Sequence, residues 1–195
     1  MMKKIKGLLN QIFYKTITLW VYTFEDLQLG SKVVFKLMPQ ILKHKNAKIS
    51  IGNGSTINSS NYGYHINMFS RCKLFADRSN SIIEIGENTR IHGTCIHAFN
   101  KIKIGDNCLI AANTNIIDGN GHELSMDTPE NRINTKDNGN PIIIENNVWI
   151  AANCIILGGT RIGKGAIITA ASVVKGDVPE KSVFGGNPAK LIKQY

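Results

Sequence analysis

Aliphatic residues recur at every sixth position through much of the chain. The longest unbroken series contains six of them: Ile144, Ile150, Ile156, Ile162, Ile168 and Val174. The same spacing joins three residues upstream: Ile104, Ile110 and Ile116. A helix has a period of 3.6 residues and a half-buried strand has a period of two, so neither explains this interval. We therefore predict a coil of short strands in which each hexad forms one strand.

A second column, of small residues, supports the same coil. The residue four positions after each aliphatic is nearly always small: Thr89, Cys95, Cys108, Thr114, Val148, Cys154, Thr160, Ala166 and Ser172. Three hexads would close one turn of a triangular prism, with aliphatic side chains inside and turn-prone Asn and Gly at the corners. The cysteines form no C-x-x-C pair, so we interpret them as small buried side chains and not as zinc ligands or a redox dithiol.

The first 46 residues lack the repeat and show helical spacing instead. The apolar positions are Ile5, Leu8, Leu9, Ile12, Phe13 and Trp20, and lysines lie near the edges of that face at Lys3, Lys6 and Lys15. We favour a helix that covers the open end of the prism, where strand edges need a lid. The alternative is a basic amphipathic helix that contacts a membrane surface through residues 1–22. The predicted division is a helical segment over 1–46 and a prism domain over 47–195.

Two further segments depart from the period. Ile116 and Ile144 are 28 positions apart where six would continue the coil, which predicts a protruding loop near 118–141. Long excursions from a rigid scaffold are often functional. Near the end of the chain, Asn187-Pro188 has the residue types of a helix cap and first helical position, which predicts a short C-terminal helix through Lys193.

Composition narrows the possible functions. With 195 residues and 43% hydrophobic content, the chain can bury a core and is not a disordered segment. The net charge of +9 favours anionic partners, but the lysines are scattered and no aromatic-basic motif suggests nucleic acid. No run reaches the roughly 18 apolar residues that span a bilayer. We expect a cytoplasmic protein, with attachment to the inner face of the membrane as the alternative.

His122 is the first candidate for chemistry. It lies at the root of the predicted loop, in the segment Asp118-Gly119-Asn120-Gly121-His122-Glu123. The regular coil before it would fix its position, and the neighbouring glycines leave room for a ligand. A histidine in a polar loop is by itself more often without a catalytic role, so its context has to decide.

The sequence around His122 and after it resembles the hexapeptide-repeat acyltransferase superfamily, in particular the sugar O-acetyltransferase branch related to galactoside and maltose acetyltransferases. The resemblance covers about residues 83–193 and rests on four motifs in order: DGNGH at 118–122, NVWIAAN at 147–153, AASVV at 170–174 and GNPAK at 186–190. It implies an all-β fold, a left-handed parallel β-helix. It also implies a bacterial homotrimer that binds acetyl-CoA in clefts between subunits.

The resemblance implies that His122 is the general base. A neutral imidazole would accept the proton of a hydroxyl as the oxygen attacks the thioester carbonyl. Asp118 or Glu123 could orient the second ring nitrogen. Equally, Asp118 could simply shape the turn.

The resemblance also implies a set of coenzyme-binding residues. Trp149 would line the cleft, while Ala152 and Ala170 would present backbone groups along the pantetheine arm. Lys175 and Lys190 stand where family members place basic residues near the phosphates, in keeping with lysine as a point charge.

The acceptor is the most open part of the prediction. We expect a saccharide hydroxyl of a capsule, O-antigen or exopolysaccharide unit, small or oligomeric. A serine or sugar-nucleotide N-acetyltransferase is the neighbouring alternative. His92, His97 and His122, with His65 as a possible replacement, allow a zinc site like that of gamma-class carbonic anhydrases, although the spacing differs. A non-catalytic scaffold is the remaining alternative. We expect no metal.

Overall fold

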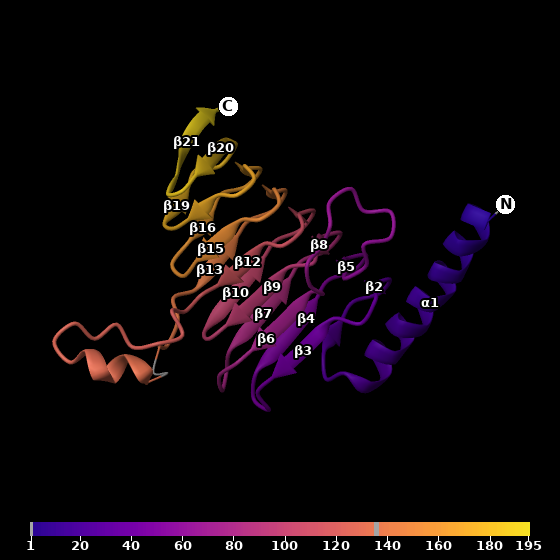
Figure 1. The fold of residues 1–195 in the computed structure, drawn as a ribbon, viewed down its shortest axis with the longest axis horizontal. Helices are drawn as coiled ribbons and strands as arrows, with labels where there is room; N and C mark the ends of the chain where they lie inside the picture. The colour runs from indigo at the N-terminus through magenta and orange to yellow at the C-terminus, as the bar shows by residue number, and fades with distance from the viewer. Residues whose placement is uncertain (1, 135–136) are drawn as a thin grey trace.

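The computed structural model describes residues 2–134 and 137–195. Its body is a three-sided prism made of three parallel sheets (Figure 1). Sheet A contains β1 (Gln28–Leu29), β4 (Lys48–Ile51), β7 (Ile82–Ile85), β10 (Lys101–Ile104), β13 (Ile142–Ile144), β16 (Arg161–Ile162) and β19 (Asp177–Val178). Sheet B contains β2 (Val34–Lys36), β5 (Thr56–Asn58), β8 (Arg90–His92), β11 (Leu109–Ile110), β14 (Trp149–Ile150), β17 (Ile167–Ile168), β20 (Ser182–Gly186) and β21 (Ala189–Gln194). Sheet C contains β3 (Gln40–Lys43), β6 (Lys73–Ala76), β9 (Cys95–Ala98), β12 (Asn115–Ile117), β15 (Ile155–Leu157) and β18 (Val173–Val174).

The aliphatic residues at every sixth position fill the interior of the prism. Ile110 and Ile116 are completely buried, and each stacks on the equivalent residue of the next coil, Ile150 and Ile156. Full burial of such a side chain contributes about 1.5–3 kcal/mol, so the repeat itself stabilises each coil. The predicted β-helix is confirmed.

The small column lies at the inner edge of the corners. Cys72, Cys108 and Cys154 are buried and Cys95 is half-buried, and all four are free thiols. Burial raises the pKa of each thiol, that of Cys72 to about 11. These cysteines are therefore protonated at neutral pH and act as small packing groups.

Asparagine shapes the corners. Asn107, Asn147 and Asn153 have φ values between 56° and 62°, the left-handed region that asparagine tolerates better than most residues. Where coils approach most closely only glycine fits, since a Cβ on Gly86 would lie 2.6 Å from the carbonyl carbon of Gly105.

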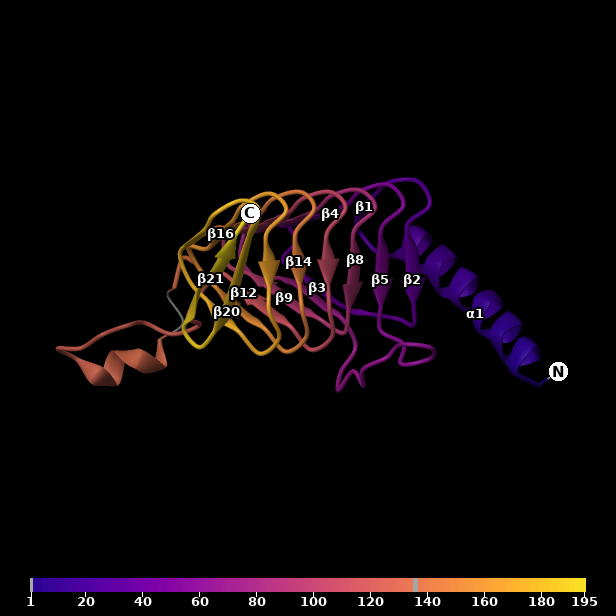
Figure 2. The same cartoon turned by 90° about the horizontal axis from the view of Figure 1, so that it is seen from above.

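The prism begins one coil earlier than predicted. Strands β1, β2 and β3 precede residue 47, and β1 pairs with β4. The sixfold register is present there as Leu29, Phe35, Ile41 and Ala47, but phenylalanine and alanine conceal it. Before it lies α1 (Met2–Phe24), which packs against β2 at the N-terminal end of the prism (Figure 2). Neither α1 nor any other described helix is long and apolar enough to cross a bilayer.

The predicted C-terminal helix is wrong. The chain turns back after β20, and β21 pairs antiparallel with it from Ser182–Gln194 to Gly186–Ala189. β20 is the last parallel strand of sheet B, so its free edge offers unpaired backbone groups. Pairing with β21 provides hydrogen-bond partners for these groups. This stabilisation outweighs the local preference of Asn187-Pro188 for the start of a helix.

The protruding loop lies where the sequence predicts it. The chain leaves the prism after β12 and returns at β13, and the excursion contains a 3₁₀ helix, η1 (Pro129–Ile133). It extends away from the prism body (Figures 1 and 2).

Candidate active site

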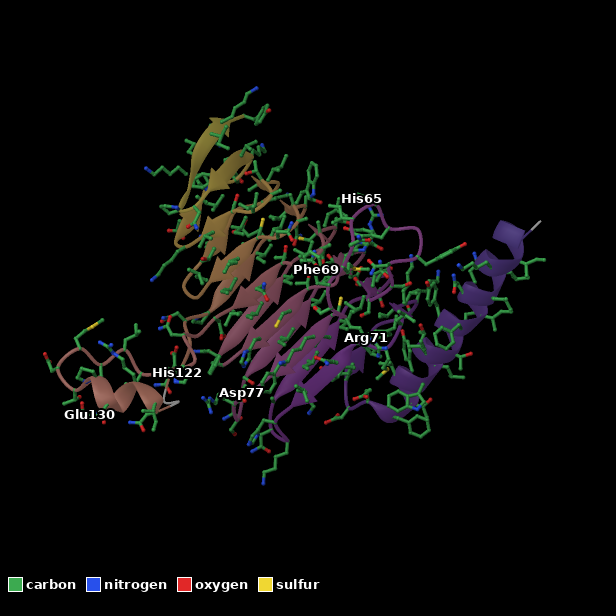
Figure 3. The ribbon with its side chains drawn as sticks, viewed as in Figure 1. His65, Phe69, Arg71, Asp77, His122 and Glu130 are labelled. Carbon is green, nitrogen blue, oxygen red and sulfur yellow. The ribbon has the colours of Figure 1, made fainter. Side chains whose placement is uncertain are left out.

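His122 lies at the corner where sheet C passes into sheet A. Its side chain is exposed at the root of the excursion (Figure 3). A cavity of about 340 Å³ adjoins it, and the other lining residues include Asn120, Glu123, Asp137 and Asn140. These four side chains can form hydrogen bonds, and Leu124 and Gly139 add apolar surface, so the cavity presents groups of both kinds to a ligand.

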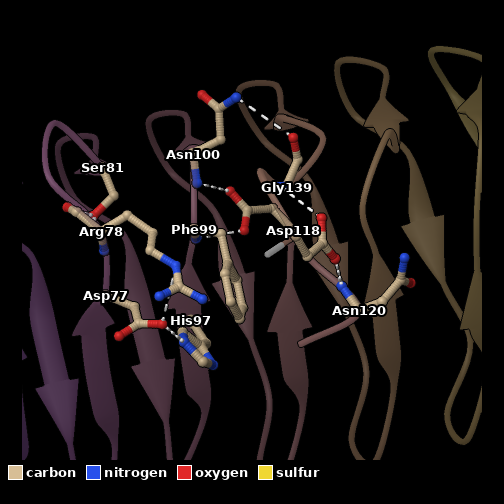
Figure 4. A network of polar contacts seen from close by, with 10 residues as sticks. Asp77, Arg78, Ser81, His97, Phe99, Asn100, Asp118, Asn120 and Gly139 are labelled. Atoms are coloured by element: carbon tan, nitrogen blue, oxygen red, sulfur yellow. Dashed lines mark hydrogen bonds and ion pairs between the residues drawn. The ribbon is translucent and has the colours of Figure 1, made fainter. Parts of the chain in front are cut away.

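Asp118 fixes the root of the excursion. Its buried carboxylate accepts the backbone N–H of Phe99 at 2.6 Å and of Asn100 at 2.9 Å (Figure 4). Its carbonyl oxygen accepts the backbone N–H of Asn140 at 2.6 Å, so one residue ties the outgoing and returning chains to the prism. Burial raises the pKa of the carboxyl group, while the two N–H donors oppose that shift.

The bonds of Asp118 bear on its two predicted roles. Each carboxylate oxygen accepts a backbone donor, and no hydrogen bond joins them to His122 within the described chain. These bonds are those of a residue that shapes the turn before His122.

A ridge of stacked rings lies on sheet C close to this corner. His97 lies between Phe75 and Phe99, with ring centroids 4.4 and 4.5 Å away. Its Nε2 is 3.6 Å from Oδ2 of Asp77, and the Arg78 guanidinium lies 5.1 Å from the Phe99 ring centre (Figure 4). Burial lowers the pKa of His97, and Asp77 opposes that shift. From the sequence, His97 was a candidate only as a zinc ligand, and no role was predicted for Phe75, Phe99 or Asp77.

A second cavity, of about 460 Å³, lies along sheet B and the loop after β5. Trp149, Ala152 and Ala170 line it, so three of the five predicted coenzyme residues are brought together. Trp149 is 49% exposed, which leaves an indole face available to a ligand. Lys175 and Lys190 are exposed and do not line this cavity.

The same cavity contains aromatic residues that sequence reasoning missed. Tyr64 stacks on His92 with ring centroids 4.4 Å apart, and the Asn58 amide nitrogen lies 3.0 Å from Nδ1 of His92. Burial, with nearby Arg90, lowers the pKa of His92 to about 4, so this imidazole is neutral at physiological pH. The available signal was the break in period around Tyr64 and His65.

The histidines of the zinc-site alternative lie on different parts of the fold. His92 lies on sheet B, His97 on sheet C, and His122 on the excursion. Within residues 2–134 and 137–195, no group of His, Cys, Asp and Glu is arranged to hold a metal ion.

The two cavities lie at different places around the prism. His122 is at the C-to-A corner, whereas the loop that carries His65 joins sheet B to sheet C. Figure 3 shows these two residues on opposite sides of the molecule. A single chain thus holds two separate cavities.

Comparison with known proteins identifies the family. A family model for the bacterial transferase hexapeptide (six repeats) matches residues 141–176, and one for the hexapeptide repeat of succinyl-transferase matches residues 82–117. An Escherichia coli K12 protein named as a lipopolysaccharide biosynthesis O-acetyl transferase, WbbJ, is 30% identical over 155 residues, 74% of this chain and 75% of WbbJ. The chain belongs to the hexapeptide-repeat acyltransferases.

Solved structures of this family carry the coenzyme. A hexapeptide-repeat acetyltransferase of Vibrio cholerae in complex with acetyl coenzyme A matches with a TM-score of 0.55 and 27% identity, over 79% of this chain and 70% of that one. Galactoside acetyltransferase in complex with coenzyme A matches with a TM-score of 0.56 and 25% identity, over 86% of this chain and 64% of that one.

A Staphylococcus aureus 2,3,4,5-tetrahydropyridine-2,6-dicarboxylate N-acetyltransferase is 56% identical over 54 residues, and the chain spans only 23% of that enzyme.

Membership of the family confirms three predictions. The prism is a left-handed parallel β-helix, the chain is an acyltransferase of the type that uses acetyl-CoA, and the sugar O-acetyltransferase branch is among its relatives.

Proposed function

We propose that this protein transfers an acetyl group from acetyl-CoA to a hydroxyl of a saccharide, with His122 as the general base. The observation that carries the proposal is the exposed imidazole at the root of the excursion beside a cavity, together with the Trp149 cavity on sheet B. The cavity beside His122 has several hydrogen-bonding side chains as well as apolar surface, which suits a saccharide, whose hydroxyl groups and C–H faces can contact both. The second cavity combines an indole face with small alanines, which suits a pantetheine arm.

The chemistry is a direct transfer. Neutral His122 accepts the hydroxyl proton while the acceptor oxygen attacks the thioester carbonyl. The tetrahedral intermediate collapses, the carbon–sulfur bond breaks, and the imidazolium returns the proton to the departing thiolate. The products are the acetyl ester and coenzyme A, and no acyl-enzyme is required.

A complete site would require two copies of the chain. His122 of one subunit and the Trp149 cavity of its neighbour would face each other across an interface, as cyclic threefold symmetry allows. We therefore propose a homotrimer. Lys175 and Lys190 remain candidates for the coenzyme phosphates, since both ammonium groups are exposed.

A hydroxyl is the preferred acceptor because the WbbJ relative, matched over three quarters of its length, is named for O-acetyl transfer. The short Staphylococcus match is to an N-acetyltransferase, so an amine acceptor, such as the amino group of a nucleotide sugar, is the second candidate. Four free thiols agree with a reducing compartment, and we place the enzyme in the cytoplasm.

The test measures coenzyme A release from acetyl-CoA with a panel of sugars, nucleotide sugars, oligosaccharides and serine. Loss of general-base catalysis typically costs 10²–10⁴-fold, so His122→Ala should reduce acceptor-dependent turnover by roughly that factor. His44→Ala is the matched control, because His44 lines neither cavity. Acceptor-dependent turnover of His122→Ala at the wild-type rate would refute the assignment.

Mixed subunits test the shared site. His122→Ala and Trp149→Ala proteins, each weakly active alone, should regain activity when co-assembled, because some interfaces then combine an intact His122 with an intact Trp149. Failure to regain activity in verified mixed trimers would refute a site built from two subunits.

A further inference from the structure

The helix α1 carries its apolar face on the side away from the prism. Seven large apolar side chains, each 45–70% exposed, lie along it: Ile5, Leu8, Leu9, Ile12, Phe13, Trp20 and Phe24. Their spacing of three and four residues places them on one face of the helix. A helix that only covered the prism would turn such a face inward, so this arrangement needs another explanation.

The opposite face holds the helix in this orientation. The Tyr14 hydroxyl lies 2.8 Å from Oγ of Ser60, and Oγ1 of Thr18 accepts the backbone N–H of Phe35 at 3.0 Å. Val21 is fully buried in the core of the prism. Turning the apolar face inward would break both hydrogen bonds and expose Val21. The outward face is therefore a stable feature of the fold.

The charge of this segment indicates what covers the face. Residues 1–24 contain four lysines and no aspartate or glutamate, and the whole chain has a net charge of +9. Lys6 and Lys15 belong to α1, and Trp20 lies on the exposed apolar face. Lysine next to exposed tryptophan and leucine is the pattern of helices that lie in the interface of an anionic bilayer. Two copies of this helix would bring like charges together, which argues against self-pairing.

We propose that α1 binds the surface of an anionic membrane, with its axis in the plane of the interface and its apolar face in the headgroup region. The helix lies at the N-terminal end of the prism, so the prism extends away from it (Figure 2). In the proposed trimer, with prism axes along the threefold axis, three such helices would share one end, and their combined binding would exceed that of one. Binding by α1 itself does not depend on the proposed activity.

The experiment uses the full chain and sedimentation with vesicles of phosphatidylglycerol and phosphatidylcholine. The variant Leu9→Glu with Ile12→Glu changes two exposed positions, and glutamate keeps good helix propensity. Each lost apolar contact should weaken partitioning about tenfold, so the double variant should bind roughly 100-fold more weakly. Ile133→Glu, at an exposed apolar position outside α1, is the matched control and should bind like the wild type.

Fluorescence gives an independent readout. The chain has two tryptophans, so in a Trp149→Phe background the emission reports Trp20 alone. Emission should move to shorter wavelength with anionic vesicles and not with phosphatidylcholine alone. Thermal unfolding of each variant checks that the prism is intact.

Two outcomes would overturn the proposal. One is equal vesicle binding by the wild type and the double variant. The other is a wild type that ignores vesicles while the double variant lowers the oligomeric mass, which would assign the face to contacts between copies.

Discussion

Asp118→Ala tests how the structure holds the loop that carries His122. The Asp118 carboxylate is fully buried and accepts two backbone N–H groups at 2.6 and 2.9 Å. A hydrogen bond to a charged group contributes about 1.5–3 kcal/mol, and alanine leaves both donors unpaired. Partial access of water would recover some of this loss. We expect the free energy of unfolding to fall by about 3–5 kcal/mol.

Asp118→Asn is the informative partner variant. Its amide oxygen can accept one N–H, but its NH₂ group cannot accept the other. We therefore expect about half the loss, roughly 1.5–2.5 kcal/mol. Urea unfolding of both variants, with an unchanged slope against denaturant, would measure these values.

The pH profile of turnover separates the two roles of Asp118. If the carboxylate only shapes the turn, Asp118→Asn should change the yield of active protein and leave the pH midpoints of kcat unchanged. A destabilisation below about 0.5 kcal/mol combined with a shifted midpoint would refute the reasoning, because it would mean that Asp118 acts on the His122 imidazole.

Three further predictions concern the prism. Gly86→Ala should lower the free energy of unfolding by about 1–3 kcal/mol, because its Cβ would lie 2.6 Å from the Gly105 carbonyl carbon. Gly7→Ala in α1 meets only ordinary contacts and should raise the free energy of unfolding by about 0.5–1 kcal/mol. If both variants shifted the urea midpoint in the same direction relative to the wild type, this contrast would be contradicted. Ile116→Ala should cost about 2–5 kcal/mol by the same measurement, since Ile116 is fully buried, and a loss below 1 kcal/mol would count against the stacked core. The pKa of His92 is lowered to about 4, so between pH 6.5 and 4 the unfolded chain binds more protons than the folded one. As the pH falls through that window, the free energy of unfolding should therefore decrease by about 1–3 kcal/mol, after allowance for partial exposure of the ring. His92→Gln should flatten that part of the stability curve, and an unchanged curve would place the titrating group elsewhere.

The sequence predicted the prism and the grouping of Trp149, Ala152 and Ala170 because a regular period determines which residues are neighbours in successive coils. Trp149 pairs with Ile167 in the next coil, and the Ala171 N–H binds the Ala152 carbonyl, so residues three hexads apart become neighbours. A correct register therefore places Trp149, Ala152 and Ala170 together without any knowledge of side-chain packing.

The errors occurred where the period is absent or overridden. Tyr64 lies in a loop whose path depends on tertiary contacts, so its stacking on His92 could not be predicted from the six-residue spacing. Phe35 keeps the sixfold register but not the expected residue type. At the C-terminus, pairing of the free edge of β20 decided the structure, and this edge becomes visible only once the sheet is assembled.

The rigidity of the prism is the reason why the proposed site needs a second copy of the chain. Trp149 is held by strand pairing on both sides, and the root of the His122 loop is held by the Asp118 bonds. No hinge motion of one chain can bring these elements together without breaking sheet B or that root. An assembly that places the C-to-A corner of one copy against sheet B of another solves the problem with no conformational change. Light scattering should therefore give a trimer, and full activity in a monomer would contradict the shared site.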